Sequence, residues 1–157
     1  MRQGKWLSML CAAALSAACG GGDAGGIQAA VQGSWMRCEG AATTSLSLGV
    51  VFSGRDYTET VRTWGTPACT GAPTSEFVDL GTFVLGAPFA TTLGGAPVTA
   101  YALDVSVPGY ETFHDLVYLD TAATPHRLYL GELAGGLDGS TPALRPTTLD
   151  TFYLTRR

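Results

Sequence analysis

The chain of 157 residues has few charged side chains and very few basic ones. Only 14% of its residues are charged, Lys5 is its one lysine, and the formal net charge is −4. Without Arg2 and Lys5, which precede the first apolar run, 7 arginines remain against 13 acidic residues. A domain so poor in cations has no electrostatic means of holding a phosphate backbone, so we expect no nucleic-acid partner.

The local motifs of common catalytic and metal sites are also missing. The sequence contains no Gly-x-Ser-x-Gly, no His-Glu-x-x-His and no Cys-x-x-Cys, and His114 and His126 are its only histidines. His114 and Asp115 are adjacent, and adjacent side chains on a strand point to opposite faces, so they cannot form a catalytic pair. We expect no catalytic residue, no metal and no cofactor. A hydrolase with a triad of distant residues, inactivated in His114→Ala, stays open as an alternative.

The N-terminus has the organisation of a secretory signal peptide. Arg2 and Lys5 form a positive start, residues 6–15 are mostly apolar, and residues 16–18 supply the small side chains of a cleavage site. An apolar stretch of this length falls short of the roughly 20 residues that a helix needs to cross a bilayer. We therefore expect residues 1–18 to be removed.

A cysteine at the cleavage point makes this signal more specific. Leu15-Ser16-Ala17-Ala18-Cys19 resembles the lipobox of bacterial lipoproteins, although Ser16 stands where Leu is usual. The resemblance implies that the Cys19 thiol receives a diacylglyceryl group and anchors the protein in a membrane of the cell envelope. Gly20 rather than Asp follows, which in a Gram-negative cell implies the outer membrane, on its periplasmic or surface face. An ordinary signal peptide with an incidental cysteine is the alternative.

A Gly-rich tether follows the cysteine. Residues 20–26, Gly-Gly-Gly-Asp-Ala-Gly-Gly, contain no large apolar side chain to bury, and as a random coil they would span about 15 Å. We divide the chain into a signal peptide (1–18), a lipidated cysteine with its tether (19–26) and a single domain (27–157).

Two of the four cysteines stay available for a disulfide. Cys11 leaves with the signal peptide and Cys19 takes the lipid, so Cys38 and Cys69 remain in an oxidising compartment. We predict a Cys38–Cys69 bridge, which would add roughly 3–4 kcal/mol of stability by chain entropy.

The domain itself has the pattern of an all-β protein. Apolar residues alternate with polar or small ones over 46–52 and 101–107, and no helical period is sustained. Eight strands are expected, near residues 31–38, 43–52, 56–64, 76–85, 98–107, 112–120, 127–131 and 151–155, with a break from Gly86 to Pro97.

Eight short antiparallel strands favour an up-and-down barrel, and a two-sheet sandwich is the alternative. In a barrel, we expect alternate apolar positions to face the interior: Leu46, Leu48, Phe52, Leu103 and Val105. A barrel embedded in the membrane stays open as well, and it would have to keep Asp104, Asp115 and Asp120 away from lipid.

Gly33-Ser34-Trp35 opens the first expected strand and resembles the start of lipocalin-like barrels. In that family the tryptophan closes one end of the barrel and packs against an arginine near the C-terminus. The resemblance implies that Arg156, or else Arg157 or Arg145, stacks on Trp35.

Two looser resemblances carry no activity. Trp35, Cys38-Glu39, Phe52 and Cys69 are together similar to part of the extracellular domain of a Wnt-inhibiting membrane glycoprotein family, which would also pair the two cysteines. Residues 128–150 resemble the C-terminal part of uncharacterised bacterial lipoproteins.

Two functions therefore stand first. One is a non-enzymatic, lipid-anchored interaction or structural module that contacts another envelope protein. The other is a lipocalin-like carrier of a small apolar ligand. The volume left inside the barrel distinguishes them, because a filled interior leaves no room for a ligand.

Overall fold

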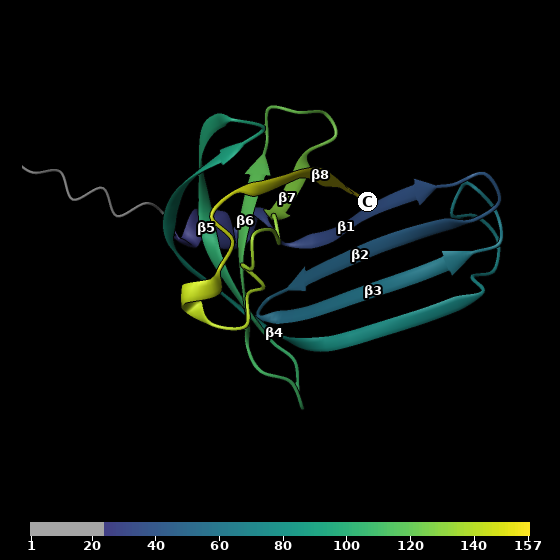
Figure 1. Ribbon diagram of the computed structural model, residues 1–157, viewed down its shortest axis with the longest axis horizontal. Coiled ribbons are helices and arrows are strands. Elements are labelled where there is room, and N and C mark those ends of the chain that lie inside the picture. Colours follow the sequence, from purple (N-terminus) through teal and green to yellow (C-terminus); the bar gives the residue numbers. More distant parts are fainter. Residues whose placement is uncertain (1–23) are drawn as a thin grey trace, which may run out of the picture.

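The computed structural model describes residues 24–157; the expected signal peptide, Cys19 and the first part of the tether lie outside them. Eight strands form one closed antiparallel barrel (Figure 1). They are β1 (Gly33–Gly40), β2 (Ser45–Ser53), β3 (Asp56–Trp64), β4 (Ser75–Leu93), β5 (Ala96–Ser106), β6 (Phe113–Asp120), β7 (Arg127–Gly131) and β8 (Leu149–Arg156). The prediction of an eight-stranded, lipocalin-like up-and-down barrel is confirmed. The sandwich is wrong, because β8 pairs with β1 and closes all eight strands into one barrel.

The apolar core fills one end of the barrel. Inward side chains from several strands pack there, and Phe52 lies at the centre of an aromatic group. Its ring centroid is 4.7 Å from that of Phe83, edge to face, and 5.7 Å from that of Tyr57.

A short helix, α1 (Ala24–Ala30), closes the packed end. Ile27 packs against the core, and the side chains of Gln28 and Gln32 hydrogen-bond the backbone of Gly54 in the β2–β3 turn. The helix includes the last three residues of the expected tether, and the first strand starts at Gly33 rather than at Val31. Burial of Ile27 and Val31 in the core outweighs the low helix propensity of the glycines, which local composition could not show.

The expected break from Gly86 to Pro97 is wrong over most of its length. β4 continues through it to Leu93, with a register shift against β5 between Leu85 and Pro88. Pro88 lacks an N–H, and a bulge is one of the few places where a sheet accepts that. The chain reverses at Gly94-Gly95, where φ is +56° and +85°, as a two-residue hairpin turn requires.

The predicted Cys38–Cys69 disulfide is confirmed. It holds the β3–β4 loop against the outer face of β1 and β2. The same loop is fixed by the Cys69 amide, which donates to Ser45 Oγ at 2.8 Å, and by the Trp64 indole, which donates to the carbonyl of Gly71 at 3.3 Å. The bridge therefore ties a loop to the barrel wall rather than joining two sheets.

β1 and β8 share only two residue pairs, Trp35 with Arg156 and Met36 with Thr155. Figure 1 shows β1 to β3 and the first half of β4 extending past β6, β7 and β8. Beyond the two pairs, the Arg37 guanidinium of β1 lies over the Phe152 ring of β8, 3.7 Å from its centroid. The barrel is thus tightly closed near α1 and looser at its other end.

Candidate functional site

A cavity of about 1100 Å³ occupies the end of the barrel that faces away from α1. Its walls include residues of the β5–β6 loop and of the segment after β7, together with side chains from all eight strands. Leu48, Leu103 and Val105 line it, as expected for inward positions. Leu103 and Val105 also belong to the packed core, and Phe52 belongs to that core without lining the cavity. Leu46 has the same parity as Leu48 but is 43% exposed, because it lies at the end of the sheet.

Carboxylates dominate the charged groups of this cavity. Seven acidic residues line it, while Arg37 is the one basic residue of the 24–157 segment that does so. The acidic residues are Glu59, Asp79, Glu111, Asp115, Glu132, Asp138 and Asp150. The interior therefore has a negative potential.

Asp115 is the most deeply placed of these carboxylates, with an exposed fraction of 6%. Its Oδ1 accepts the amide of Leu116 at 2.7 Å and that of Gly131, on β7, at 2.9 Å. Burial raises the pKa of Asp115 to about 7, and the charge of Glu59 acts in the same direction. The two amides and the Arg145 guanidinium oppose that rise.

A glycine is required where β7 meets Asp115. A Cβ on Gly131 would lie 2.4 Å from Asp115 Oδ1 and 2.6 Å from Pro146 Cβ. The register of β7 against β8 shifts between Tyr129 and Gly131. The Asp115 carboxylate thus accepts a hydrogen bond from a backbone amide at a point where the pairing of β7 with β8 is irregular.

Tyr57 and Glu59 form a second polar pair on β3. The buried Tyr57 hydroxyl donates to Glu59 Oε2 at 2.6 Å, and both residues line the cavity. Burial, followed by the charge of Glu59, raises the pKa of the Tyr57 phenol above its usual range, so it stays a hydrogen-bond donor.

Large apolar side chains surround the mouth. Phe77, Tyr110, Leu133 and Phe152 all line the cavity and are each more than half exposed. Such a group of exposed apolar side chains around an opening is typical of a binding site.

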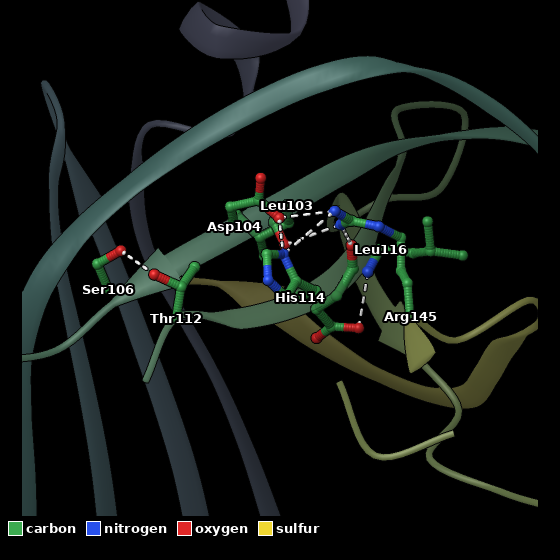
Figure 2. Close-up of polar contacts among 8 residues, drawn as sticks. Leu103, Asp104, Ser106, Thr112, His114, Leu116 and Arg145 are labelled. Carbon is green, nitrogen blue, oxygen red and sulfur yellow. Dashed lines mark hydrogen bonds and ion pairs between the residues drawn. The ribbon is translucent and has the colours of Figure 1, made fainter. Parts of the chain in front are cut away.

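The outer face of β5 and β6 holds a different polar cluster. Figure 2 shows Asp104, His114 and Arg145 converging from β5, β6 and the segment before β8. Asp104 Oδ1 lies 2.7 Å from His114 Nδ1 and accepts from Arg145 Nη2 at 2.6 Å. Partial burial raises the pKa of Asp104, but the hydrogen bonds from His114 and Arg145 outweigh it and hold that pKa below its usual value.

This cluster attaches the 132–148 segment to the barrel. Arg145 also donates to the backbone carbonyls of Leu103 and Asp115 (Figure 2). The nearby hydroxyls of Ser106 and Thr112 hydrogen-bond each other at 2.9 Å. Sequence analysis missed the Asp104–His114 pair because it depends on the β5–β6 register.

The structure places the other candidate residues as follows. The Arg156 guanidinium lies 5.5 Å from the centroid of the Trp35 ring and donates to the carbonyl of Gln32 at 2.7 Å, at the closed end of the barrel. Arg145 lies in the outer cluster instead. His126 immediately precedes β7, and Cys19 lies outside the described residues.

Across residues 24–157, no three His, Cys, Asp or Glu side chains are grouped so that they could hold a metal ion. Within the same range, no helix has the length and hydropathy to span a bilayer. Comparison of the chain with family models, curated proteins and solved structures found no match.

Proposed function

We propose that this protein is a lipid-anchored, non-enzymatic protein of the cell envelope that binds a small, largely apolar molecule in the open end of its barrel. The observation that carries the proposal is the cavity of about 1100 Å³. Pockets that enclose small molecules typically measure about 300–1,000 Å³. The barrel interior therefore offers ample room for such a ligand.

The division of the barrel into two halves supports this proposal. Trp35, Phe52 and Phe83 of the packed core do not line the cavity, whereas Leu103 and Val105 belong to both, so the core borders the cavity directly. The walls of the open end combine apolar side chains with a few fixed polar groups, such as Tyr57 with Glu59, and Asp115. Apolar surface gives affinity, and the polar groups fix orientation.

The anchor is proposed from the lipobox resemblance at Cys19. α1 begins at Ala24, five residues later, and lies at the closed end of the barrel. A lipid on Cys19 would therefore hold the closed end towards the membrane and leave the mouth facing the aqueous phase.

A matched pair of substitutions tests ligand binding. Leu48 lines the cavity, whereas Leu80 on β4 is exposed. We expect Leu48→Trp to abolish most of the heat of binding of 1-octanol, and Leu80→Trp to leave it unchanged. The measurement is isothermal titration calorimetry of the full chain in phosphatidylcholine vesicles, with protein-free vesicles as the blank. Equal binding by both variants would show that the cavity is not the site.

The competing proposal is an interaction or structural module that works through its outer surface. It predicts that 1-octanol binds no better to the protein than to lipid alone, and that Leu48→Trp leaves the role of the protein in the cell unaffected. The calorimetric comparison therefore decides between the two proposals.

A further inference from the structure

We propose that the ligand is an amphiphilic cation: an apolar body carrying a protonated or quaternary amine, with the charged group held among the carboxylates of the cavity. This inference rests on the proposed ligand-binding function and adds the charge of the ligand to it.

The charge balance of the cavity is the first argument. Seven carboxylates line it against one guanidinium, that of Arg37. Arg37 is already occupied, because it forms an ion pair with Glu39 and lies over the Phe152 ring. An anionic ligand would thus find no free cation on these walls, and an acidic cleft with low-dielectric walls concentrates cations instead.

The seven carboxylates differ in whether another group of the protein already holds them. Asp138 is held by the amide and hydroxyl of Ser140, and Glu132 accepts from Thr148. Asp79 and Glu111, by contrast, form no hydrogen bond or ion pair with any side chain or amide in residues 24–157. Their charges face the cavity and its mouth without a partner.

Asp115 supplies a buried counter-charge. Both of its hydrogen bonds end on Oδ1, and its Oδ2 has no donor among residues 24–157. The Asp115 side chain is 94% buried and lines the cavity, and because no buried side-chain oxygen in residues 24–157 lacks a partner, its Oδ2 is accessible to a small molecule there. A cation in the cavity could pair with this oxygen at short range.

The mouth of the cavity also suits a cation. Phe77 and Tyr110 present aromatic rings there, and the ring of Phe152 already carries the Arg37 guanidinium on one face. The face of an aromatic ring attracts ammonium groups, quaternary ones most clearly, whereas it offers nothing comparable to an anion.

Three probes that share one alkyl chain test the inference: octyltrimethylammonium, 1-octanol and octanesulfonate. Their charges do not change with pH, so only the charge of the head group distinguishes them. Each is titrated by calorimetry into the full chain in phosphatidylcholine vesicles, with protein-free vesicles as the blank. We expect octyltrimethylammonium to bind about tenfold more tightly than 1-octanol, the factor that about 1.4 kcal/mol produces, and octanesulfonate to bind least.

The outcomes separate the two proposals. Equal or tighter binding of 1-octanol or octanesulfonate would overturn the cation inference and leave the ligand-binding function standing. If none of the three probes binds above the vesicle blank, the proposed function fails and the inference fails with it.

Charge-neutralising substitutions locate the interaction. Asp79→Asn and Asp115→Asn each remove a carboxylate from the cavity, and Asp56→Asn removes an exposed one outside it. We expect the first two to lower the preference for octyltrimethylammonium over 1-octanol several-fold, and Asp56→Asn to preserve it. Asp79 forms no hydrogen bond among the described side chains, so its variant stays informative if Asp115→Asn folds poorly. A preference that survives in both cavity variants would overturn the inference.

Discussion

Asp115 and Gly131 are joined through the inside of the barrel: the Gly131 amide donates to Asp115 Oδ1 at 2.9 Å. This bond links β6 to β7 at the point where the β7 ladder is irregular, and it fixes a carboxylate on the cavity wall. One contact therefore serves the fold and the candidate site together.

Gly131→Ala should destabilise the protein. The new Cβ would lie 2.4 Å from Asp115 Oδ1 and 2.6 Å from Pro146, both of which are held in place, so overpacking should cost about 1–3 kcal/mol in the free energy of unfolding. Urea denaturation measures the change. Gly49→Ala is the control, because its Cβ would meet only ordinary contacts at 3.7 Å or more. Similar stability of the two variants would contradict the packing argument.

Asp115 should make the protein less stable as the pH rises from about 4 to about 7. Its pKa is raised from the usual 3.8 to about 7 in the folded state, so over that range the folded protein binds a proton that the unfolded chain has released. Stability from this group is fully present below pH 4 and is lost by pH 7.

The groups that face Asp115 across the cavity are Glu59 and Tyr57 from β3, Asp79 from β4, Arg37 from β1, Asp150 from β8 and Glu132 after β7, with Arg145 on the outside. Because these groups also titrate or carry charge, the measurement is a difference. Urea unfolding from pH 4 to pH 8 should show a decline in the wild type that Asp115→Asn lacks. Parallel curves would refute the assignment to Asp115.

Arg145→Met should loosen the 132–148 segment while the barrel stays folded. The substitution removes donors to Asp104 and to two backbone carbonyls but retains much of the apolar side chain, and a lost hydrogen bond to a charged group costs about 1.5–3 kcal/mol. Hydrogen exchange should speed up over residues 132–148 and stay unchanged in β2 and β3. The control is Arg55→Met, an exposed arginine in the β2–β3 turn. Unchanged exchange in the segment would show that Arg145 does not anchor it.

Cys19→Ser should abolish lipid attachment. If the thiol carries a diacylglyceryl group, metabolic palmitate labelling marks the wild type and not the variant, and the variant leaves the membrane fraction. Two acyl chains hold a protein at a membrane stably, so the shift in fractionation should be nearly complete. Cys11→Ser serves as the control and should keep its label. Labelling that persists in Cys19→Ser would exclude the lipobox interpretation.

The alternation of apolar and polar residues was sufficient to predict most of the strands and the barrel. Successive side chains of a strand point to opposite faces, so a strand with one buried face shows this period in its sequence. It also predicted that His114 and Asp115 point apart: the first lies in the outer cluster and the second in the cavity. The continuation of β4 past Gly86 was missed, since a bulge accommodates residues that would otherwise end a strand.

The candidate site was beyond prediction for a related reason. Asp104 meets His114 only through the β5–β6 register, and Asp115 meets Gly131 only through the shifted ladder of β7. A single sequence shows which residues share a face of one strand but not which residues of other strands lie opposite. The size of the cavity depends on how far the core residues fill the barrel, which is likewise a property of the assembled sheet.

A Cβ at Gly131 would meet both Asp115 Oδ1 and the buried Pro146, so these two side chains pack against the same point of β7. Arg145 immediately precedes that proline, and the charge of its guanidinium lowers the pKa of the Asp115 carboxyl. A substitution at Arg145, which does not line the cavity, can therefore change the proton affinity of a carboxylate that does.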